Sequence, residues 1–298
     1  MLYSKNVNLE DRYDMPLDGL SNYRVRNNTI YTYSIELNAV RHCNLSCRGC
    51  SHSSPIAPKN EIDPSVASAD LLALSHFLKS KTIRILGGEP LLHSSLKNLL
   101  KEIKNSNIST SICLVTNGTL LQLIDDDLTR YIDEVQISLY QLKTQKMNEI
   151  RMQAERLINM GIKVELKEIP FFREAICQKQ TDNPTLINMV YESCVIAHVW
   201  RCITIDNGRL YRCPQSLFYA ENSSDYSDSM NIQDIQCVND LLEFLENNDA
   251  CKACSQCLGS IGNLFPHEQI KKELWKNSLP LSPETGIDFD FARGFRIV

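Results

Sequence analysis

Hydrophobic positions along this chain switch between two spacings, and each switch marks a new predicted element. Five segments alternate apolar and polar side chains, as strands do, at residues 35–40, 82–86, 111–115, 134–140 and 163–169. Between them, three segments carry apolar residues every three or four positions, as helices do, at residues 66–78, 96–103 and 147–157. Asp63-Pro64 provides an N-cap and a first-turn proline for the first helix, and Gly161 ends the last one. This order of strands and helices predicts parallel βα units.

The polar faces of the strands favour a barrel over an open sheet. Gln136, Ser138 and Tyr140 share one face of their strand, and Glu165 and Lys167 share one face of the next. An open parallel sheet with helices on both sides needs apolar residues on both faces. A barrel can instead turn its polar faces inward, toward a bound substrate. We therefore predict an α/β fold with a partial TIM-type barrel.

The predicted elements divide the chain into four parts. Residues 1–33 are polar with little periodicity, and we predict an N-terminal extension there. Residues 34–190 contain the βα units of the barrel. Residues 191–262 contain shorter elements, among them a hairpin and one helix, and form a separate small module. Residues 263–298 are left as a C-terminal tail.

Charge and composition exclude several classes of protein. The 298 residues carry 31 basic and 36 acidic side chains, a formal net charge of -5, which does not suit neutralisation of a nucleic-acid backbone. No apolar run is long enough to span a bilayer, and the N-terminus lacks the pattern of a signal peptide. We expect a cytoplasmic protein that binds neither nucleic acid nor membrane.

Twelve cysteines are the strongest chemical feature of the composition. A reducing cytosol leaves metal binding, catalysis or core packing as their uses. Cys43, Cys47 and Cys50 lie in one short loop directly after the first strand. Three thiolates can hold three irons of a four-iron, four-sulfur cube and leave the fourth iron open. A zinc site completed by His52 and a set of purely structural thiols are the alternatives.

A second group of cysteines falls in the predicted small module. Asn207-Gly208 is typical of a type I′ hairpin loop, and this register places Cys202 opposite Cys213. A disulfide between these two thiols is one possibility, and a metal site shared with the later cysteines is the one we favour. Two thiols from the hairpin and two from the later triplet can complete a four-cysteine site, for which zinc also fits, at Cys202, Cys213, Cys251 and Cys254.

Cys43-x3-Cys47-x2-Cys50 after the first strand, followed by a Gly-Gly-Glu-Pro turn after the second, resembles the radical S-adenosylmethionine (radical SAM) superfamily. The resemblance covers roughly residues 33–170 and implies a (β/α)6 partial barrel. It implies that the open iron binds SAM and that one electron cleaves SAM to a 5′-deoxyadenosyl radical. It also implies that SAM is contacted at three strand ends, by Gly87, Gly88, Glu89, Pro90, Asn117 and Ser138.

One position departs from the pattern of this family. An aromatic residue that touches adenine commonly precedes the third cysteine, and Gly49 stands there instead. The resemblance therefore requires another residue to pack against adenine, and His52 is our candidate.

The hairpin and the close-spaced cysteines after it are similar to the auxiliary-cluster extensions called SPASM and to their shortened form, the twitch domain. This resemblance covers roughly residues 194–260 and implies a second 4Fe-4S cluster, held by the four cysteines of the shared site. Cys257 is an alternative to Cys254 as the fourth ligand.

Together, the two resemblances imply an enzyme that removes a hydrogen atom from a small polyhydroxylated substrate, such as a sugar, a cyclitol or an aminoglycoside. The outcome is epimerisation or alcohol dehydrogenation, with flavodoxin or ferredoxin as the reducing partner. Cys194, Cys237 and Cys257 are candidate hydrogen donors, and Glu165 and Tyr140 are candidates for acid or base work. A peptide-modifying radical SAM enzyme is the first alternative, and a non-catalytic iron-sulfur or zinc protein is the second.

Overall fold

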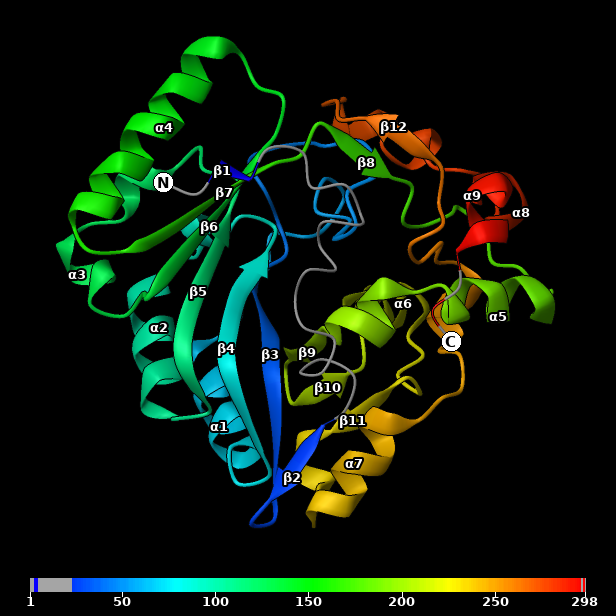
Figure 1. Ribbon diagram of the computed structural model, residues 1–298, viewed down its shortest axis with the longest axis horizontal. Coiled ribbons are helices and arrows are strands. Elements are labelled where there is room, and N and C mark those ends of the chain that lie inside the picture. The colour runs from blue at the N-terminus through cyan, green and yellow to red at the C-terminus, as the bar shows by residue number, and fades with distance from the viewer. Residues whose placement is uncertain (1–2, 5–22, 296, 298) are drawn as a thin grey trace.

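The computed structural model describes residues 3–4, 23–295 and 297, and its centre is a sheet of mostly parallel strands (Figure 1). Strands and helices alternate in the predicted order, as β3 (Thr29–Val40), α1 (Pro64–Leu74), β4 (Leu78–Gly87), α2 (Leu96–Asn105), β5 (Ser109–Thr116), α3 (Asp126–Thr129), β6 (Glu134–Leu139), α4 (Thr144–Asn159) and β7 (Lys163–Glu168). The five strands lie in the order β7-β6-β5-β4-β3, and every neighbouring pair is parallel. The predicted α/β class is confirmed.

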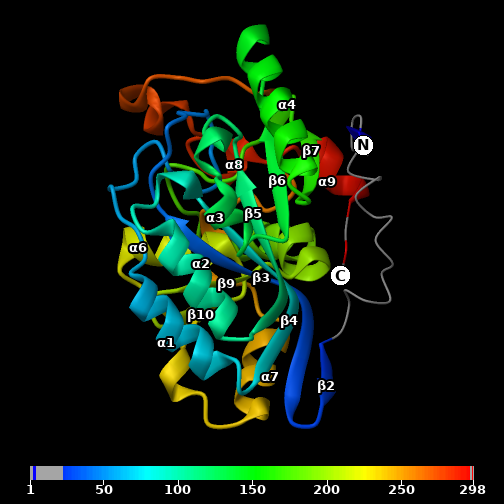
Figure 2. The ribbon, with the colours of Figure 1, turned by 90° about the vertical axis from the view of Figure 1, so that its left-hand side faces the viewer.

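The helices of this series lie on one face of the sheet (Figure 2). Ile35 and Leu37 of β3 are fully buried in the main hydrophobic cluster, together with Leu71 of α1. Glu36 and Asn38 of the same strand point to the opposite face, because successive strand side chains alternate. The inner face is therefore polar, and the predicted partial barrel is confirmed.

The barrel contains five strands linked as βα units, whereas the resemblance implied six. After β7 the chain forms β8 (Phe171–Arg173), which pairs antiparallel with β12 (Leu264–Pro266) and does not extend the sheet. The two edges of the five-strand set are occupied by β1 (Tyr3–Ser4), parallel to β7, and by β9 (Ile203–Asp206), parallel to β3. Within the described residues, a sixth βα unit is therefore absent.

Two boundaries lie elsewhere than the sequence predicts. β2 (Arg24–Arg26) and the first residues of β3 belong to the sheet although they fall within the predicted extension, of which residues 1–2 and 5–22 lie outside the described part. Leu78, which continued the helical spacing, begins β4 instead, because α1 ends at Leu74. Leu78 pairs with Ile30 and is fully buried, so its apolar side chain serves the sheet and not the helix.

The hairpin of the small module forms in the predicted register. β10 (Arg209–Tyr211) pairs with β9, and Asn207 and Gly208 have φ angles of 41° and 77°, as a type I′ turn requires. The remaining elements are short, namely α5 (Pro184–Glu192), α6 (Pro214–Ser223), β11 (Ser229–Asn231), α7 (Val238–Glu246), α8 (Pro283–Gly286) and α9 (Phe289–Gly294). In the ranges that the structure describes, no helix is long and apolar enough to cross a membrane.

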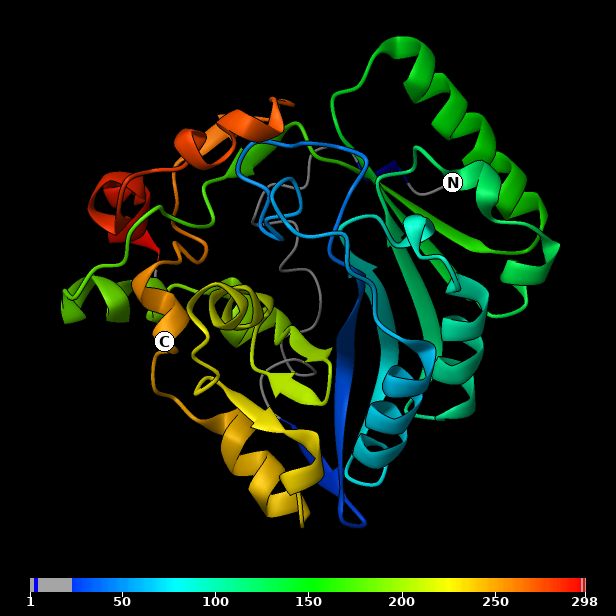
Figure 3. The ribbon, with the colours of Figure 1, turned by 180° about the vertical axis from the view of Figure 1, so that it is seen from behind.

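The predicted C-terminal tail packs on the loop that follows β3, which we call the cysteine loop (residues 41–54; Figure 3). Gln269 forms a β-bridge with Cys47. The indole of Trp275 is almost fully buried and donates a hydrogen bond to the Cys47 carbonyl at 3.0 Å. Part of the C-terminal segment is therefore built into the region of the first cysteine triplet.

Candidate active site

Two glycines allow the turn after β4 to touch the cysteine loop. The amide of Gly88 donates to the Val40 carbonyl at 2.8 Å, and the amide of Glu89 donates to the His42 carbonyl at 3.0 Å. A Cβ atom on Gly88 would lie 1.9 Å from the His42 oxygen, and Gly87 has a φ of 124°. Since a larger residue at either position would displace the backbone, the two glycines set this close approach.

The three thiols of the cysteine loop lie near one another. Burial raises the pKa of all three, to about 11 for Cys43, and a neighbouring thiolate raises the pKa of Cys43 and of Cys47 further. The pKa of Tyr140 is raised, first by burial and then by the charges of Cys47, Cys50 and Cys43. The three sulfurs therefore lie near one another, and the Tyr140 hydroxyl lies near all three.

Hydrogen-bond donors point at these sulfurs. The backbone amides of residues 52–54 donate to the sulfur of Cys50. The Nε2 atom of His267 lies 3.2 Å from the sulfur of Cys47. Such donors stabilise negative charge on sulfur, which is the state of a metal-bound cysteine. The donor set therefore fits an iron-sulfur cluster.

Glu89 is fully buried and ties the turn to the end of β5. Its carboxylate accepts a hydrogen bond from the Thr116 hydroxyl at 2.7 Å and another from the Asn117 amide at 2.8 Å. Burial raises the pKa of Glu89 to about 7, against the lowering effect of these bonds. Its charge also raises the pKa of Cys43, so the carboxylate lies near the first thiol. Pro90 begins the short 3-10 helix that follows.

Asn117 and Ser138 lie at strand ends close to the thiols. The Asn117 amide donates to the Asn44 side chain at 2.9 Å and to the sulfur of Cys43 at 3.5 Å. The buried hydroxyl of Ser138 forms a hydrogen bond with Tyr140. Both side chains are placed where they can reach a ligand of the thiols, and their contact with SAM stays a prediction.

A ring from the C-terminal segment occupies the space beside Gly49. A Cβ atom on Gly49 would lie 2.7 Å from the ring of Phe265. The Arg48 guanidinium lies over the same ring, 4.3 Å from its centre, and forms an ion pair with Glu174 at 2.9 Å. An aromatic ring of β12 therefore lies beside the residue that precedes the third cysteine.

His52 contacts the small module. Its ring meets Phe218 of α6 edge-on, with 5.3 Å between ring centres. Burial and the nearby Arg41 charge lower the pKa of His52 to about 4, so the ring is neutral. The structure thus places His52 against α6, and its contact with adenine stays a prediction. Among the described residues, no three His, Cys, Asp or Glu side chains converge as the ligands of one metal ion would.

Inward-facing side chains of the barrel form a connected polar cluster. The amide oxygen of Gln136 accepts hydrogen bonds from Arg84 at 2.7 Å and from Lys167 at 3.0 Å. Glu165 lies 3.4 Å from Lys167, and Glu36 lies 3.9 Å from Arg84. Glu165, a candidate acid or base, is therefore a member of an ion pair on the inner wall.

Five further thiols line one cavity of about 280 Å³ in the small module, which we call the cysteine cavity. They are Cys194, Cys213, Cys251, Cys254 and Cys257. Hydrogen bonds from Cys213 and Cys254 lower the pKa of Cys251, and so does the charge of Arg212, whose guanidinium donates to this sulfur at 3.1 Å. Burial raises the pKa of Cys194 to about 11 and that of Cys257 to about 12. A lowered pKa favours the thiolate form of Cys251, and the thiolate is the form of cysteine that binds metal.

Two cysteines with predicted roles are not among the residues that line this cavity. Cys202, predicted as a ligand, forms a hydrogen bond with Glu36 of the barrel. The hairpin ladder ends at Thr204, and Arg201 has a left-handed φ of 46°, so the chain leaves the register that placed Cys202 opposite the cysteine after β10. Cys237, a candidate hydrogen donor, is exposed at the start of α7.

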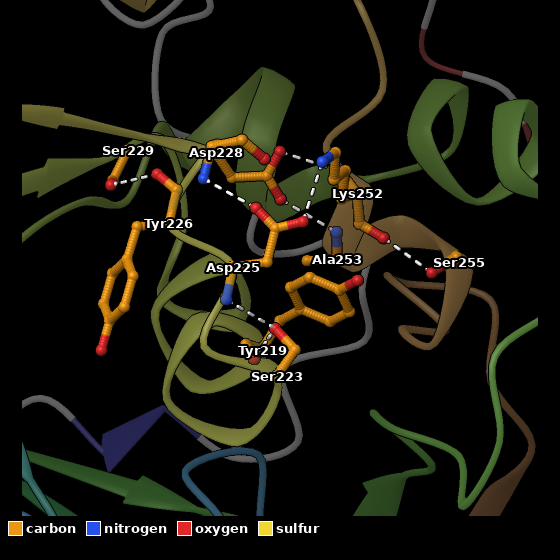
Figure 4. Close-up of polar contacts among 10 residues, drawn as sticks. Tyr219, Ser223, Asp225, Tyr226, Asp228, Ser229, Lys252, Ala253 and Ser255 are labelled. Atoms are coloured by element: carbon orange, nitrogen blue, oxygen red, sulfur yellow. Dashed lines mark hydrogen bonds and ion pairs between the residues drawn. The ribbon is translucent and has the colours of Figure 1, made fainter.

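An acidic turn fixes the segment that carries the later cysteines (Figure 4). Asp228 accepts hydrogen bonds from the backbone amides of Lys252 at 2.8 Å and Ala253 at 2.9 Å. The Lys252 ammonium also pairs with Asp225 at 2.8 Å. The 3-10 helix Lys252–Ser255 is thereby attached to the turn between α6 and β11.

The fold is thus a partial βα barrel with three neighbouring thiols in the loop at the carboxyl end of β3. Residues 37–165 match the radical SAM superfamily, and this part of the chain is a radical SAM domain. The match includes the cysteine loop, the glycine turn and both strand ends near the thiols. The match to this superfamily implies SAM and one 4Fe-4S cluster as cofactors.

Curated relatives share part of the chain. GTP 3′,8-cyclase of Chlorobaculum tepidum is 34% identical over 109 residues, which is 36% of this chain and 33% of that protein. GTP 3′,8-cyclase of Helicobacter pylori is 29% identical over 154 residues, which is 45% of this chain and 46% of that protein. The matches span less than half the length of these relatives.

Solved structures of low sequence identity also align with the chain. The crystal structure of BtrN in complex with AdoMet and 2-DOIA has a TM-score of 0.46 and 16% identity, over 84% of this chain and 87% of that one. The structure of hexahistidine-tagged anSMEcpe with bound AdoMet has a TM-score of 0.49 and 14% identity, over 88% and 94%.

Three residues of the candidate sites escaped the sequence interpretation. Phe265, His267 and Trp275 lie more than 200 residues after the loop that they contact, in a segment without a clear period. Their aromatic character amid polar neighbours was the one available sign that the segment is buried.

Proposed function

We propose that the chain is a radical SAM enzyme with one 4Fe-4S cluster at Cys43, Cys47 and Cys50 and a second cluster in the cysteine cavity. The observation that carries the proposal is that the three loop thiols lie near one another, close to the glycine turn and to Tyr140. When bound, the first cluster supplies the electron that cleaves SAM to methionine and a 5′-deoxyadenosyl radical. Flavodoxin or ferredoxin would provide that electron.

The side chains around the thiols would bind and orient SAM. The Glu89 carboxylate, buried beside Cys43, suits the ammonium group of SAM, because a carboxylate favours a nearby positive charge. Asn117 and Ser138 place polar groups at neighbouring strand ends for the ribose and the carboxylate of SAM. Phe265 offers the aromatic surface that the loop itself lacks.

The second cluster would be held by Cys194, Cys213, Cys251 and Cys254, with Cys257 as the alternative to Cys254. This set replaces Cys202 by Cys194, because Cys194 lines the cysteine cavity and Cys202 bonds to Glu36. A four-cysteine zinc site fits the same ligands by number, so metal analysis is part of the test below.

The inner wall supports a small, hydroxyl-rich substrate. Asn38 is 2% exposed, and neither its amide nitrogen nor its amide oxygen has a hydrogen-bond partner among the described residues. A buried amide without partners is costly, so a ligand that both donates and accepts hydrogen bonds, as a hydroxyl does, would relieve it. Arg84, Gln136 and Lys167 add further polar groups on the same wall.

The reaction that we propose is epimerisation or dehydrogenation of a sugar, cyclitol or aminoglycoside. The curated relatives are named GTP 3′,8-cyclase, and a match to a minor part of their length does not transfer their substrate. GTP therefore belongs among the candidate substrates that the assay compares.

Anaerobic reconstitution with iron and sulfide tests the cofactors. We expect about eight irons per chain, an electron paramagnetic resonance (EPR) signal that changes when SAM is added, and 5′-deoxyadenosine under reducing conditions. Cys43→Ala should abolish 5′-deoxyadenosine, whereas Cys237→Ser, at an exposed thiol outside both sites, should not. Zinc alone, or no 5′-deoxyadenosine from the reconstituted protein, would contradict the proposal.

Incubation of candidate substrates in deuterated water separates the two reactions. Deuterium retained on carbon indicates quenching of the substrate radical by an exchangeable thiol and therefore epimerisation. Loss of the mass of two hydrogen atoms indicates dehydrogenation. Cys257→Ala and Cys237→Ala test the two candidate donors outside the proposed ligand set, and a product that survives both changes excludes them. Cys194 is a proposed ligand, so its alanine variant does not test a donor role.

A further inference from the structure

The C-terminal segment 266–275 holds a histidine against the first cysteine triplet. The amide of Ile270 donates to the Ser46 carbonyl at 2.9 Å, and the Trp275 indole donates to the Cys47 carbonyl at 3.0 Å. These bonds fix the segment to the backbone of the cysteine loop close to His267. Ile270 and Trp275 therefore hold the segment of His267 on the loop through backbone carbonyls and not through a sulfur.

The ring of His267 is held in one position. It is 4% exposed and stacks on Tyr140, with 4.9 Å between ring centres and 16° between ring planes. Phe172 meets it edge-on at 4.9 Å. The backbone amide of His267 donates to the Pro170 carbonyl at 2.9 Å. Since rings and backbone constrain it from three sides, the 3.2 Å separation between Nε2 and the Cys47 sulfur is a built contact.

The direction of this hydrogen bond follows from the chemistry of the sulfur. A cysteine sulfur bound to iron carries no proton, so it can only accept. His267 must then donate through Nε2–H, with Nδ1 unprotonated. Nδ1 is buried and has no hydrogen-bond partner in the part of the chain that the structure describes, so no other contact there favours a proton on Nδ1.

We propose that His267 raises the reduction potential of the SAM-binding cluster by donating a hydrogen bond to the sulfur of Cys47. The proposal rests on the cluster site proposed above. Reduction adds one negative charge to the cluster, and a donor on a ligand sulfur stabilises that charge more in the reduced state than in the oxidised state. A higher potential lets a weaker reductant deliver the electron that SAM cleavage requires.

His267 is the clearest side chain through which to test such tuning. The bonds to Cys50 come mainly from backbone amides, which substitution does not remove, and the Ser54 side chain adds one more. The hydrogen bond from the Asn117 side chain to the sulfur of Cys43 is longer, at 3.5 Å, and Asn117 is also a predicted SAM contact. His267 donates at 3.2 Å and comes from outside the barrel strands.

The test compares midpoint potentials of the reconstituted full chain by EPR-monitored redox titration, without substrate. The cluster to follow is the one whose signal changes when SAM is added. His267→Phe keeps a stacked ring and removes the donor, so its potential should become more negative. His267→Gln places an amide N–H near the Nε2 position and should return toward the wild-type value. Trp275→Phe is the matched control, because it removes a bond to the Cys47 carbonyl and leaves the sulfur untouched; its potential should not change.

Equal potentials in wild type and in His267→Phe overturn the proposal, and so does an equal shift in Trp275→Phe. If His267→Phe does not assemble a cluster, pulsed EPR of the wild-type protein labelled with 15N-histidine tests the hydrogen bond directly. A 15N coupling that is lost in His267→Gln supports the hydrogen bond, and a spectrum unchanged by that substitution contradicts it. A wild-type protein that binds no iron at all would instead show that the proposed function is wrong.

Discussion

Arg41 and Asp206 form a buried ion pair, with 2.7 Å between Nη2 and Oδ2, that joins the start of the cysteine loop to the end of β9. Their side chains are 6% and 8% exposed. Glu221 of α6 is a second partner of Arg41, at 2.8 Å. The loop that would hold the SAM-binding cluster is therefore connected through Arg41 to the hairpin and helix of the small module.

Removing one member of this group should destabilise the fold. Arg41→Met leaves two carboxylates without their cation and should cost about 3–5 kcal/mol of unfolding free energy. Asp206→Asn should cost less, because Glu221 still pairs with the arginine. Urea unfolding of the iron-free chain measures both, and the double variant gives the coupling energy. An Arg41→Met variant as stable as wild type would show that the ion pair does not hold these parts together.

Gly88→Ala should abolish formation of 5′-deoxyadenosine. The new methyl would lie 1.9 Å from the His42 carbonyl oxygen, so the glycine turn and the cysteine loop would have to separate. Gly294→Ala is the matched control, because nothing lies within 4 Å of its added Cβ. Iron content and 5′-deoxyadenosine yield are the measurements, and a Gly88→Ala variant with wild-type yield would contradict the contact.

Asp228→Ala should loosen the segment that carries Cys251 and Cys254. It leaves the amides of Lys252 and Ala253 without their acceptor, which costs about 1–3 kcal/mol when such groups are buried. Iron bound in the cysteine cavity should fall, while the SAM-sensitive EPR signal should remain. Lys252→Met removes only the exposed pair with Asp225 and should change neither.

The sequence predicts what depends on neighbours along the chain, and it fails where distant segments meet. Gln136 and Ser138 face inward because strand side chains alternate, and Asn207-Gly208 sets its turn through local backbone preference. Cys202 does not line the module's cavity, because the hairpin ladder ends at Thr204 and the chain turns at Arg201, and the role of Cys202 as a ligand stays a prediction. His267 was missed because its contact with the loop depends on packing of a segment without periodicity.

Asp70 gives the fold a defined pH dependence. Its carboxylate accepts from the Gly208 amide at 2.6 Å and so supports the hairpin turn from α1. Burial raises the pKa of Asp70 above its usual range, against the effect of that bond, so the folded chain binds this proton more tightly than the unfolded chain. The contribution of Asp70 to stability should therefore fall as pH rises from about 4 toward the raised pKa, and then stay level.

Asp70→Asn should remove this slope, since the amide oxygen still accepts the bond but does not titrate. The measurement is the difference in urea midpoint between wild type and variant across that pH range. A difference that is constant with pH, or that grows in favour of wild type as pH rises, would contradict the raised pKa.

Either Cys194 or Cys202 completes the proposed ligand set of the second cluster, and single alanine variants distinguish these two alternatives. Cys194 lines the cysteine cavity with Cys213, Cys251 and Cys254, so Cys194→Ala should lose about half of the bound iron while the SAM-sensitive EPR signal remains. Cys202→Ala removes a thiol that bonds to Glu36 and should retain both clusters. Iron and sulfide analysis after anaerobic reconstitution is the measurement. If Cys202→Ala loses the second cluster and Cys194→Ala keeps it, the hairpin register must continue past Thr204 in the metal-bound protein, and binding of the cluster must then pull Cys202 away from the barrel wall.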